Sequence, residues 1–576
     1  MDLYIRSTLA HIRTLLVPSF LRPGWTYTHV DAQSDIFAGI TVALIQIPQS
    51  MAFALIAGLP AIYGLYASLA GSVAGIFGNS RYLSTGPVAI ISFLTFTSLV
   101  PLSTPGSEAY IHLASTLAFL VGGIYLMMGF FRLGFILQLV PHSVIAGFSS
   151  AAAVIIVISQ IPTLLGISIP ANDLILSNVL AIIRNVPALS FATFCIGVST
   201  IFILFFAKKF SPRIPGALIV LVLGIYGGYI FSIEGHTLAV VGSILPVLPT
   251  FFLPTLSVYS LFALIPKAGI IALVGYVYTH ATVKSISKSK KEHVDTNQEL
   301  VGQGIANIVG AFFRAYPLSG SITRTAINIE SGARTEMASI YTALFTIFAI
   351  LFLSPLFLYL PKAVLASIVI MSAFPLIHIS RLKDIFRIDK TDGYIAWITF
   401  IMVFVFKPDD ALFIGVVLAL MLFIQKTVWR ETVTEVGIDR TFAILRGEID
   451  EEDVEIIHGV VMVRVGVSMY YANAAHLLKA IHALIIQHEV RERTQVHTLV
   501  LAMSGVGFID ITGIEELEEY CTDLHDRHIH IVTIYLRTAI RDTLKSIPNF
   551  PHFTDVHNIK EMLQEVQRHR SPSRLV

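Results

Sequence analysis

Charged residues and cysteines are both scarce in this 576-residue chain. Asp, Glu, Lys and Arg make up 13% of the residues and hydrophobic residues 55%, whereas charged residues account for about 25% of a soluble domain. The composition therefore excludes an ordinary soluble protein. The two cysteines, Cys195 and Cys521, lie in regions of different character, so they predict neither a disulfide framework nor a metal cluster. The formal net charge of +1 gives no sign of a nucleic-acid partner.

Catalytic and metal-binding motifs are also missing from the sequence. There is no Walker loop, no zinc spacing and no nucleophile–histidine–acid set. The histidines of the C-terminal part are scattered and do not have the spacing of metal ligands, which favours solvated positions. We therefore predict a protein that is not an enzyme and that has neither a metal site nor a cofactor.

Residues 34–429 consist of apolar runs separated by short polar breaks, which is typical of transmembrane helices. Allowing ~20 residues for a full span, we predict about fourteen membrane segments, some of them half-length. Basic residues such as Arg132, Lys208 and Arg334 fall in every second break. By the positive-inside rule these breaks are cytoplasmic, which places both termini inside the cell and predicts an integral protein of the plasma (inner) membrane. Residues 1–33 show no secretory signal and are interpreted as a cytoplasmic, interfacial segment.

The stretch from Tyr316 to Arg324 interrupts an apolar region with a proline, a glycine, hydroxyl side chains and an arginine. A helix that begins here, capped by Ser319 or Ser321, explains this composition and places Thr323 and Arg324 in its first turn. Helix N-termini attract anions, and an arginine strengthens that attraction. Because irregular backbone at membrane depth lines cavities in transporters, we predict a buried anion site.

An earlier stretch, from Leu83 to Ala89, has the same pattern of hydroxyls, glycine and proline, with Pro87 expected at a first helical position. Two short helices in corresponding positions of two hydrophobic halves indicate a transporter site. The alternative is a chance match of small residues, which are common in membrane helices. Four pairs of residues correspond between the halves: Gly75 with Gly310, Phe77 with Phe312, Leu83 with Leu318, and Ser84 with Ser319.

The first membrane segment carries Gln46 and Gln49 on either side of Pro48. Two amides in an apolar helix are costly in lipid, so they are expected to face a cavity or a partner. Phe53 lies four residues after Gln49 and therefore on the same face. Hydrogen bonding between helices is the alternative explanation for the glutamines.

Residues 430–566 have the composition of a soluble domain, followed by a tail at residues 567–576. Strand-like and helix-like runs alternate, which predicts an α/β domain. Its sharpest feature is the loop with Asp510, Thr512 and Gly513, which precedes a helix. This loop is either a binding site for a phosphate-bearing ligand or an ordinary helix cap.

The motifs together resemble those of the sulfate permease (SulP) family, which includes mammalian anion exchangers and prestin. The resemblance covers about residues 35–566, and its C-terminal part resembles the STAS domain, with Asp510 to Gly513 as the signature loop. The motifs that carry it are Ile47–Ala54, Gly58–Pro60, Tyr63–Tyr66, Thr85–Ala89, Asp295–Leu300, Gly320–Asn328 and Ser331–Thr335.

This resemblance implies two inverted seven-helix repeats, about 34–232 and 258–429, divided into core and gate domains and followed by a cytosolic STAS domain. It also implies a homodimer. Separately, we expect a regulatory protein or nucleotide as a partner of the STAS domain. The anion site that it implies consists of Gln46, Gln49, Phe53, Val88, Ala89, Thr323 and Arg324.

The sequence departs from the family pattern at one position of the eighth segment. Many bacterial and plant members carry a carboxylate there that is linked to proton or sodium coupling, whereas this chain has Tyr278. A tyrosine with a reference pKa near 10 does not change its charge at neutral pH. His280 could titrate, but it lies two residues further on and points to a different helix face.

We therefore predict secondary transport of a small anion (sulfate, bicarbonate, chloride or a small dicarboxylate) by elevator-like exchange or uniport. The alternatives are a proton- or sodium-coupled symporter, an anion channel on the same scaffold, and a membrane sensor that signals through its STAS domain. Besides the anion, the expected partners are membrane lipid and a second copy of the chain.

Overall fold

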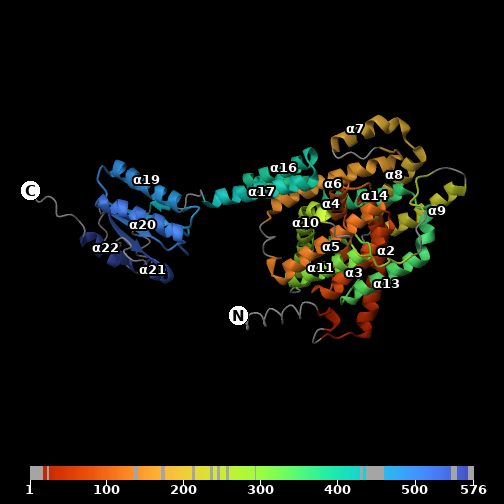
Figure 1. Ribbon diagram of the computed structural model, residues 1–576, viewed down its shortest axis with the longest axis horizontal. Helices are drawn as coiled ribbons and strands as arrows, with labels where there is room; N and C mark the ends of the chain where they lie inside the picture. Colours follow the sequence, from red (N-terminus) through yellow and green to blue (C-terminus); the bar gives the residue numbers. More distant parts are fainter. Residues whose placement is uncertain are drawn as a thin grey trace, which may run out of the picture. The chain divides into compact units, whose positions relative to one another are not determined.

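The computed structural model describes residues 17–21, 25–134, 140–169, 175–210, 215–233, 238–242, 247–254, 258–291, 294–428, 433–435, 459–545 and 554–568 (Figure 1). The chain divides into two compact units, Met1–Leu420 and Met421–Val576, each of which is described by itself. The apolar runs of the sequence also predict that one membrane segment starts near Ile136, and this start lies outside the described residues.

The first unit is helical, and its first repeat holds seven principal helices. A one-turn helix, η1 (Ser19–Leu21), precedes them, and α7 (Ile175–Asn185) with η3 (Val186–Ala188) lies between the fifth and the sixth. Residues 172–186 are amphipathic in sequence, which predicts a segment at the membrane surface, and α7 lies within them. The principal helices are α2 (His29–Ile56), α3 (Ile62–Phe77), α4 (Ala89–Leu99), α5 (Glu108–Phe130), α6 (His142–Leu165), α8 (Phe191–Phe210) and α9 (Gly216–Ile233).

The second repeat again has seven principal helices, so the fourteen predicted segments correspond to fourteen helices of the described chain. They are α10 (Val258–Lys290), α11 (Thr296–Phe312), α12 (Ile322–Glu330), α13 (Met337–Phe348), α14 (Lys362–Ala373), α16 (Lys390–Val405) and α17 (Pro408–Val428). The connecting elements are a π-turn (η4, Ala349–Leu353), two 3₁₀ turns (η5, Ser354–Tyr359, and η6, Phe374–Leu376) and α15 (Ile379–Ile388).

Length and hydropathy agree with a membrane protein. Within the described residues, eight helical stretches are long and apolar enough to cross a membrane, and α3, α4 and α9 are shorter apolar helices. Helix α15 was not predicted. Its basic residues Arg381, Lys383 and Arg387 have the pattern of a cytoplasmic break, and a surface helix of ten residues has no long apolar run by which hydropathy could identify it.

Two groups of helices pack together in this unit. Helix α11 packs against α3 and α5, while α13 packs against α2 and α3 (Figure 1). In the second group, α6 packs against α14 and α16, and α14 also packs against α8. Helix α2 contacts α9 and α14 of the second group. We refer to the first group as the core helices and to the second as the gate helices.

A buried carboxylate links the start of α2 to the turn after α12. Asp35 is fully buried, and its Oδ1 accepts hydrogen bonds from the backbone N–H groups of Arg334 and Thr335 at 2.7 and 3.1 Å. The Thr335 hydroxyl donates to Oδ2 at 2.5 Å. Because these donors satisfy the charge, Asp35 can remain buried.

The second unit is the predicted α/β domain. Its sheet has the order β3 (Val433–Glu435), β4 (Val460–Val465), β5 (Thr498–Ala502), β6 (His530–Ile534) and β7 (Thr554–Val556). β3 is antiparallel to β4, and the other neighbours are parallel. Helices α19 (Ala474–Glu492), α20 (Ile511–Asp526) and α21 (Thr538–Lys545) share a core with one face of the sheet, and α22 (Ile559–Arg568) covers the other.

Candidate functional site

Two short strands join the halves of the membrane unit. β1 (Thr85–Gly86) pairs antiparallel with β2 (Ser319–Gly320), so that Thr85 lies opposite Gly320 and Gly86 opposite Ser319. The ladder continues with the Ser321 N–H, which donates to the Ser84 carbonyl at 2.9 Å. All of these residues are buried. Because the strands are antiparallel, the chain leaves them in opposite directions.

A half-helix follows each strand. Helix α12 begins at Ile322, and the Ser321 hydroxyl accepts a hydrogen bond from the Arg324 N–H at 3.4 Å. The predicted helix start is therefore confirmed, with Ser321 as the cap and Ser319 in the strand. Helix α4 begins at Ala89 with Val88 as its N-cap residue, and no side chain caps it.

The expectation that Pro87 is the first residue of a helix is wrong. Pro87 lies before the N-cap of α4, and its carbonyl accepts a hydrogen bond from Arg324 Nη1 at 2.8 Å. With the Pro87 carbonyl engaged across the repeats, the first acceptor of the α4 ladder is the Val88 carbonyl, which accepts from the Ser92 N–H at 3.0 Å. This contact between distant parts of the chain shifts the helix start to Ala89.

The Arg324 guanidinium is completely buried at the junction of the strands. Nη1 is bonded to Pro87, while Nε and Nη2 have no hydrogen-bond partner among the described residues. A Cβ at Gly86 would lie 3.1 Å from Nη2 and 3.9 Å from Gln46 Nε2, so glycine leaves room for both side chains. A buried cation with unsatisfied donors is costly, and an anion is the natural group to offset that cost.

A polar face of α11 holds the strands in place, and most of its residues were not predicted as part of the site. Gln303 Nε2 donates to Thr85 Oγ1 at 2.7 Å. Asn307 accepts from the Leu318 N–H at 3.1 Å and donates to the Leu318 carbonyl at 3.2 Å. Glu299, from the quoted motif Asp295–Leu300, accepts from the N–H groups of the turn after α3. The signal was a polar residue at every fourth position of one apolar helix.

A cavity of about 440 Å³ opens beside the half-helices. Five of the predicted site residues line it: Gln49, Phe53, Val88, Ala89 and Thr323. Tyr278 lines it as well, together with Lys208 and Glu330. We call this space the inner cavity, because Lys208 lies in a break that the charge pattern assigns to the cytoplasm. The structure thus brings most of the predicted residues together.

Gln46 and Arg324 lie behind this surface and do not line the inner cavity. Gln46 lines a smaller space with Ser84 and Thr85, on the side of β1 where a Gly86 Cβ would approach both it and Arg324. His280 is elsewhere: its ring stacks on Tyr276 with a centroid distance of 5.6 Å, and it lines a different small space with Glu299. Tyr278 and His280 therefore face different surroundings.

The STAS-type loop caps a helix through its aspartate. Asp510 precedes α20; its Oδ1 accepts from the Gly513 N–H at 2.8 Å, and its Oδ2 accepts from the Tyr471 N–H at 2.9 Å. Thr512 is half-buried and Gly513 is buried. Both carboxylate oxygens are thus engaged by backbone donors, which is the cap alternative of the sequence analysis.

Two inverted repeats whose half-helices meet beside a buried cation, at the wall of a cavity, define a membrane transporter for anions. The sulfate permease family matches residues 33–399, and the STAS domain matches residues 452–566. The chain therefore belongs to the sulfate permease family, a family of transporters and not of enzymes, and carries a C-terminal STAS domain.

Individual relatives agree with this assignment. The chain is 31% identical over 554 residues to sulfate transporter 4.1, chloroplastic, of Arabidopsis thaliana, covering 92% of this chain and 80% of the relative. The structure of murine Slc26a9, an anion transporter in the inward-facing state, superposes with a TM-score of 0.85 at 23% identity, covering 96% and 93% of the two chains. The transmembrane domain of the cyanobacterial bicarbonate transporter BicA gives 0.58 at 24% identity, covering 68% and 98%. Both solved structures share the fold.

Proposed function

We propose that a small anion binds in the inner cavity at the N-termini of α4 and α12, and that Arg324 is the source of its selectivity for negative charge. The observation on which this proposal rests is the buried Arg324 guanidinium between two half-helices, whose Nε and Nη2 have no hydrogen-bond partner among the described residues. Helix dipoles and the arginine together offset the desolvation of one anion.

The cavity-lining side chains have separate roles in this proposal. Gln49 donates an amide N–H to the anion, and the exposed Thr323 hydroxyl adds a second donor from the first turn of α12. Phe53, Val88 and Ala89 form an apolar wall that disfavours strongly hydrated ions. Gln46 and Arg324 act from behind β1, through charge and by positioning the strand.

Transport then proceeds as elevator-like exchange or uniport. The core helices, which carry the strands and half-helices, move as a largely rigid unit against the gate helices α6, α8, α14 and α16. The inner cavity lies on the side of Lys208 and Glu330, so we assign the described conformation to an inward-facing state. The similarity to the inward-facing murine structure supports this assignment.

Uncoupled transport fits the residue at the family's coupling position. Tyr278 lines the inner cavity, and a hydroxyl there cannot take up a proton in the physiological range as a carboxylate can. The transported anion is sulfate, bicarbonate, chloride or a small dicarboxylate. Location in the plasma membrane with cytoplasmic termini, a homodimer, and regulation by a protein or nucleotide at the STAS domain complete the proposal.

One flux experiment tests the central claim. Purified protein in liposomes is supplied with each radiolabelled anion in turn, with competing anions, and with the sodium and proton gradients imposed or collapsed. We expect saturable anion flux that persists without either cation gradient. Uphill uptake driven by protons or sodium would show symport, unsaturable flux at channel rates would show a pore, and absence of flux for every anion would favour the sensor alternative.

A further inference from the structure

A second, larger cavity lies beyond the end of α2, away from the inner cavity. Phe53 lines the inner cavity, while Leu55, two residues further along the same helix, lines the second one. Along α14 the second cavity comes first: Lys362 at the start of the helix lines the second cavity, and Ile368 further along lines the inner cavity. The two spaces therefore lie in series along α2 and α14. We call the second space the outer cavity.

Hydrogen bonds hold the lining of the outer cavity in place. Its volume is about 670 Å³, and the turn between α2 and α3 forms part of its lining together with segments around Val241 and Val247. The Tyr66 hydroxyl donates to the Val247 carbonyl at 2.8 Å, and the Val241 N–H donates to the Leu360 carbonyl at 2.9 Å. The first bond attaches one segment to α3 of the first repeat, and the second attaches the other segment to the residue that follows η5 in the second repeat, so the space is a feature of the fold.

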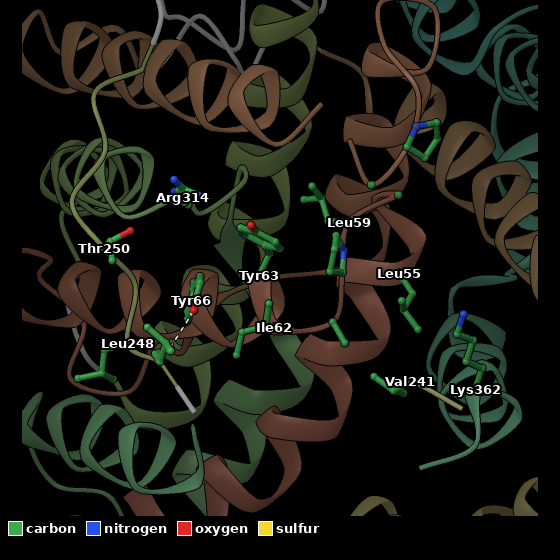
Figure 2. A pocket seen from close by; sticks show the side chains of 16 residues that line it. Leu55, Leu59, Ile62, Tyr63, Tyr66, Val241, Leu248, Thr250, Arg314 and Lys362 are labelled. Atoms are coloured by element: carbon green, nitrogen blue, oxygen red, sulfur yellow. Dashed lines mark hydrogen bonds between the residues drawn. The ribbon is translucent and has the colours of Figure 1, made fainter. Parts of the chain in front are cut away.

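The lining is largely apolar but has a basic residue at each end. Figure 2 shows Arg314 at one end, Lys362 at the opposite end, and Tyr63 and Leu59 between them. Lys362 is the first residue of α14, so its charge adds to the positive end of that helix. Among the described residues Lys362 takes part in no ion pair. A low-dielectric cavity lined by charges of one sign concentrates ions of the other sign.

The acidic residue near Arg314 does not cancel this field. Glu108 Oε2 lies 3.6 Å from Arg314 Nη1, but the glutamate side chain is 72% exposed. An ion pair that is so open to water is weak, so Glu108 offsets only part of the attraction of Arg314 for an anion. Arg314 is held from another side by Phe252, whose ring centroid lies 5.4 Å from the guanidinium carbon, and its buried Nε has no hydrogen-bond partner among the described residues. The guanidinium is thus positioned with donor capacity left over.

We propose that the outer cavity is a second anion-binding site, in which Arg314, with the Tyr63 hydroxyl beside it, takes the transported inorganic anion from the side of the membrane opposite the inner cavity. Lys362 draws the anion into the same space. This inference rests on the proposed transport function. The site determines how well the anion is captured from one side, whereas Arg324 serves anions arriving from both sides.

Sided transport measurements test this inference. External half-saturation is measured in intact cells and internal half-saturation in inside-out vesicles, with inorganic sulfate and chloride as probes. We expect Arg314→Gln to raise the external half-saturation concentration roughly threefold to tenfold, the effect of one charge at a partly solvated site, with the internal value unchanged. Lys362→Gln should act in the same direction but less strongly. Arg381→Gln, which removes an exposed cation from α15, is the control and should change neither value.

Glu108→Gln distinguishes binding from a structural ion pair. If Arg314 binds the anion, removing the competing carboxylate lowers the external half-saturation concentration. If the Arg314–Glu108 pair merely holds the fold together, both variants change transport in the same direction, which would overturn the inference. An unchanged external value in Arg314→Gln would do so as well. Should that variant fail to insert, Glu108→Gln decides alone. Lack of flux in the unmodified protein is a different result, because it contradicts the transport function itself.

Discussion

Thr85 and Gly320 lie directly opposite each other in the β1–β2 ribbon, and they are also equivalent positions of the two repeats. The alignment that places Ser84 on Ser319 places the next residue, Thr85, on Gly320. A pair of equivalent residues that face each other marks the local two-fold axis of an inverted repeat. The flanking bonds, Gly86 with Ser319 and Ser84 with Ser321, are related by the same axis.

Replacing Arg324 should weaken anion binding without preventing membrane insertion. The alanine variant loses a buried charge that attracts the anion from behind β1, an attraction of about 1.5–3 kcal/mol at an effective dielectric constant of about 20, so we expect affinity to fall roughly tenfold to a hundredfold. Lysine should rescue this loss only in part, because it keeps the charge but loses the planar fork that reaches the Pro87 carbonyl. The measurement is anion affinity per folded molecule. Unchanged affinity for every anion tested would make Arg324 purely structural.

Replacing Gly71 with alanine should displace strand β1. A Cβ at Gly71 would lie 2.3 Å from the Thr85 carbonyl oxygen, and a backbone group cannot move aside cheaply. We expect Gly71→Ala to cost about 1–3 kcal/mol and to reduce flux. Gly123→Ala is the matched control, because a Cβ there meets nothing within 4 Å. Thermal unfolding in detergent compares the two; equal midpoints would show that β1 tolerates displacement.

Tyr278 should keep transport independent of cation gradients. Since it lines the inner cavity, a glutamate at this position would place a titratable carboxylate beside the proposed anion site. We expect Tyr278→Glu to gain stimulation by an inward proton or sodium gradient, measured as uptake into liposomes. His280→Gln is the control, because His280 lines a different space. Proton-driven uptake by the unmodified protein that disappears in His280→Gln would instead assign coupling to His280.

The thiol of Cys521 should be inert in the folded STAS domain. Cys521 lies on the buried face of α20, and this burial, with Glu518 as a further cause, raises its pKa to about 12 from an ordinary value of 9.0. At pH 8 the thiolate is therefore about a thousandfold scarcer than for an unperturbed thiol. In a Cys195→Ser background, maleimide labelling followed by mass spectrometry should be slow until denaturant is added. Rapid labelling of the native protein would contradict the described packing.

Local signals in the sequence were sufficient for the membrane segments and for one half-helix start, although not for α15. Hydropathy predicted the spans, and Ser321 with its neighbours predicted α12, because capping depends on residues within one turn. The start of α4 was predicted wrongly, since the Pro87 carbonyl is engaged by Arg324 from the other half of the chain. No local pattern contains that contact.

The residues of the site that were not predicted also depend on contacts that no local pattern contains. Gln303 and Asn307 act on strands that are distant in sequence or across a tight turn, and the separation of Gln46 from Gln49 depends on which neighbours surround α2. The short strands β3 and β7 were also not predicted. Three residues carry too little periodicity to be recognised, and the sheet forms them by pairing.

The two-fold axis through Thr85 and Gly320 relates the backbones of the two half-helices, but the two half-helices carry different charges. The alignment of the halves places Arg324 on Ala89, so one half-helix contributes a permanent charge and the other contributes none. If the anion travels beside Arg324 as proposed, a chloride-loaded moving unit carries no net charge at the site, and a sulfate-loaded one carries a single negative charge. Moving one elementary charge across the membrane changes its free energy by about 2.3 kcal/mol per 100 mV of membrane potential. Membrane voltage would therefore act on sulfate-loaded and chloride-loaded movements differently, although the same helices perform both.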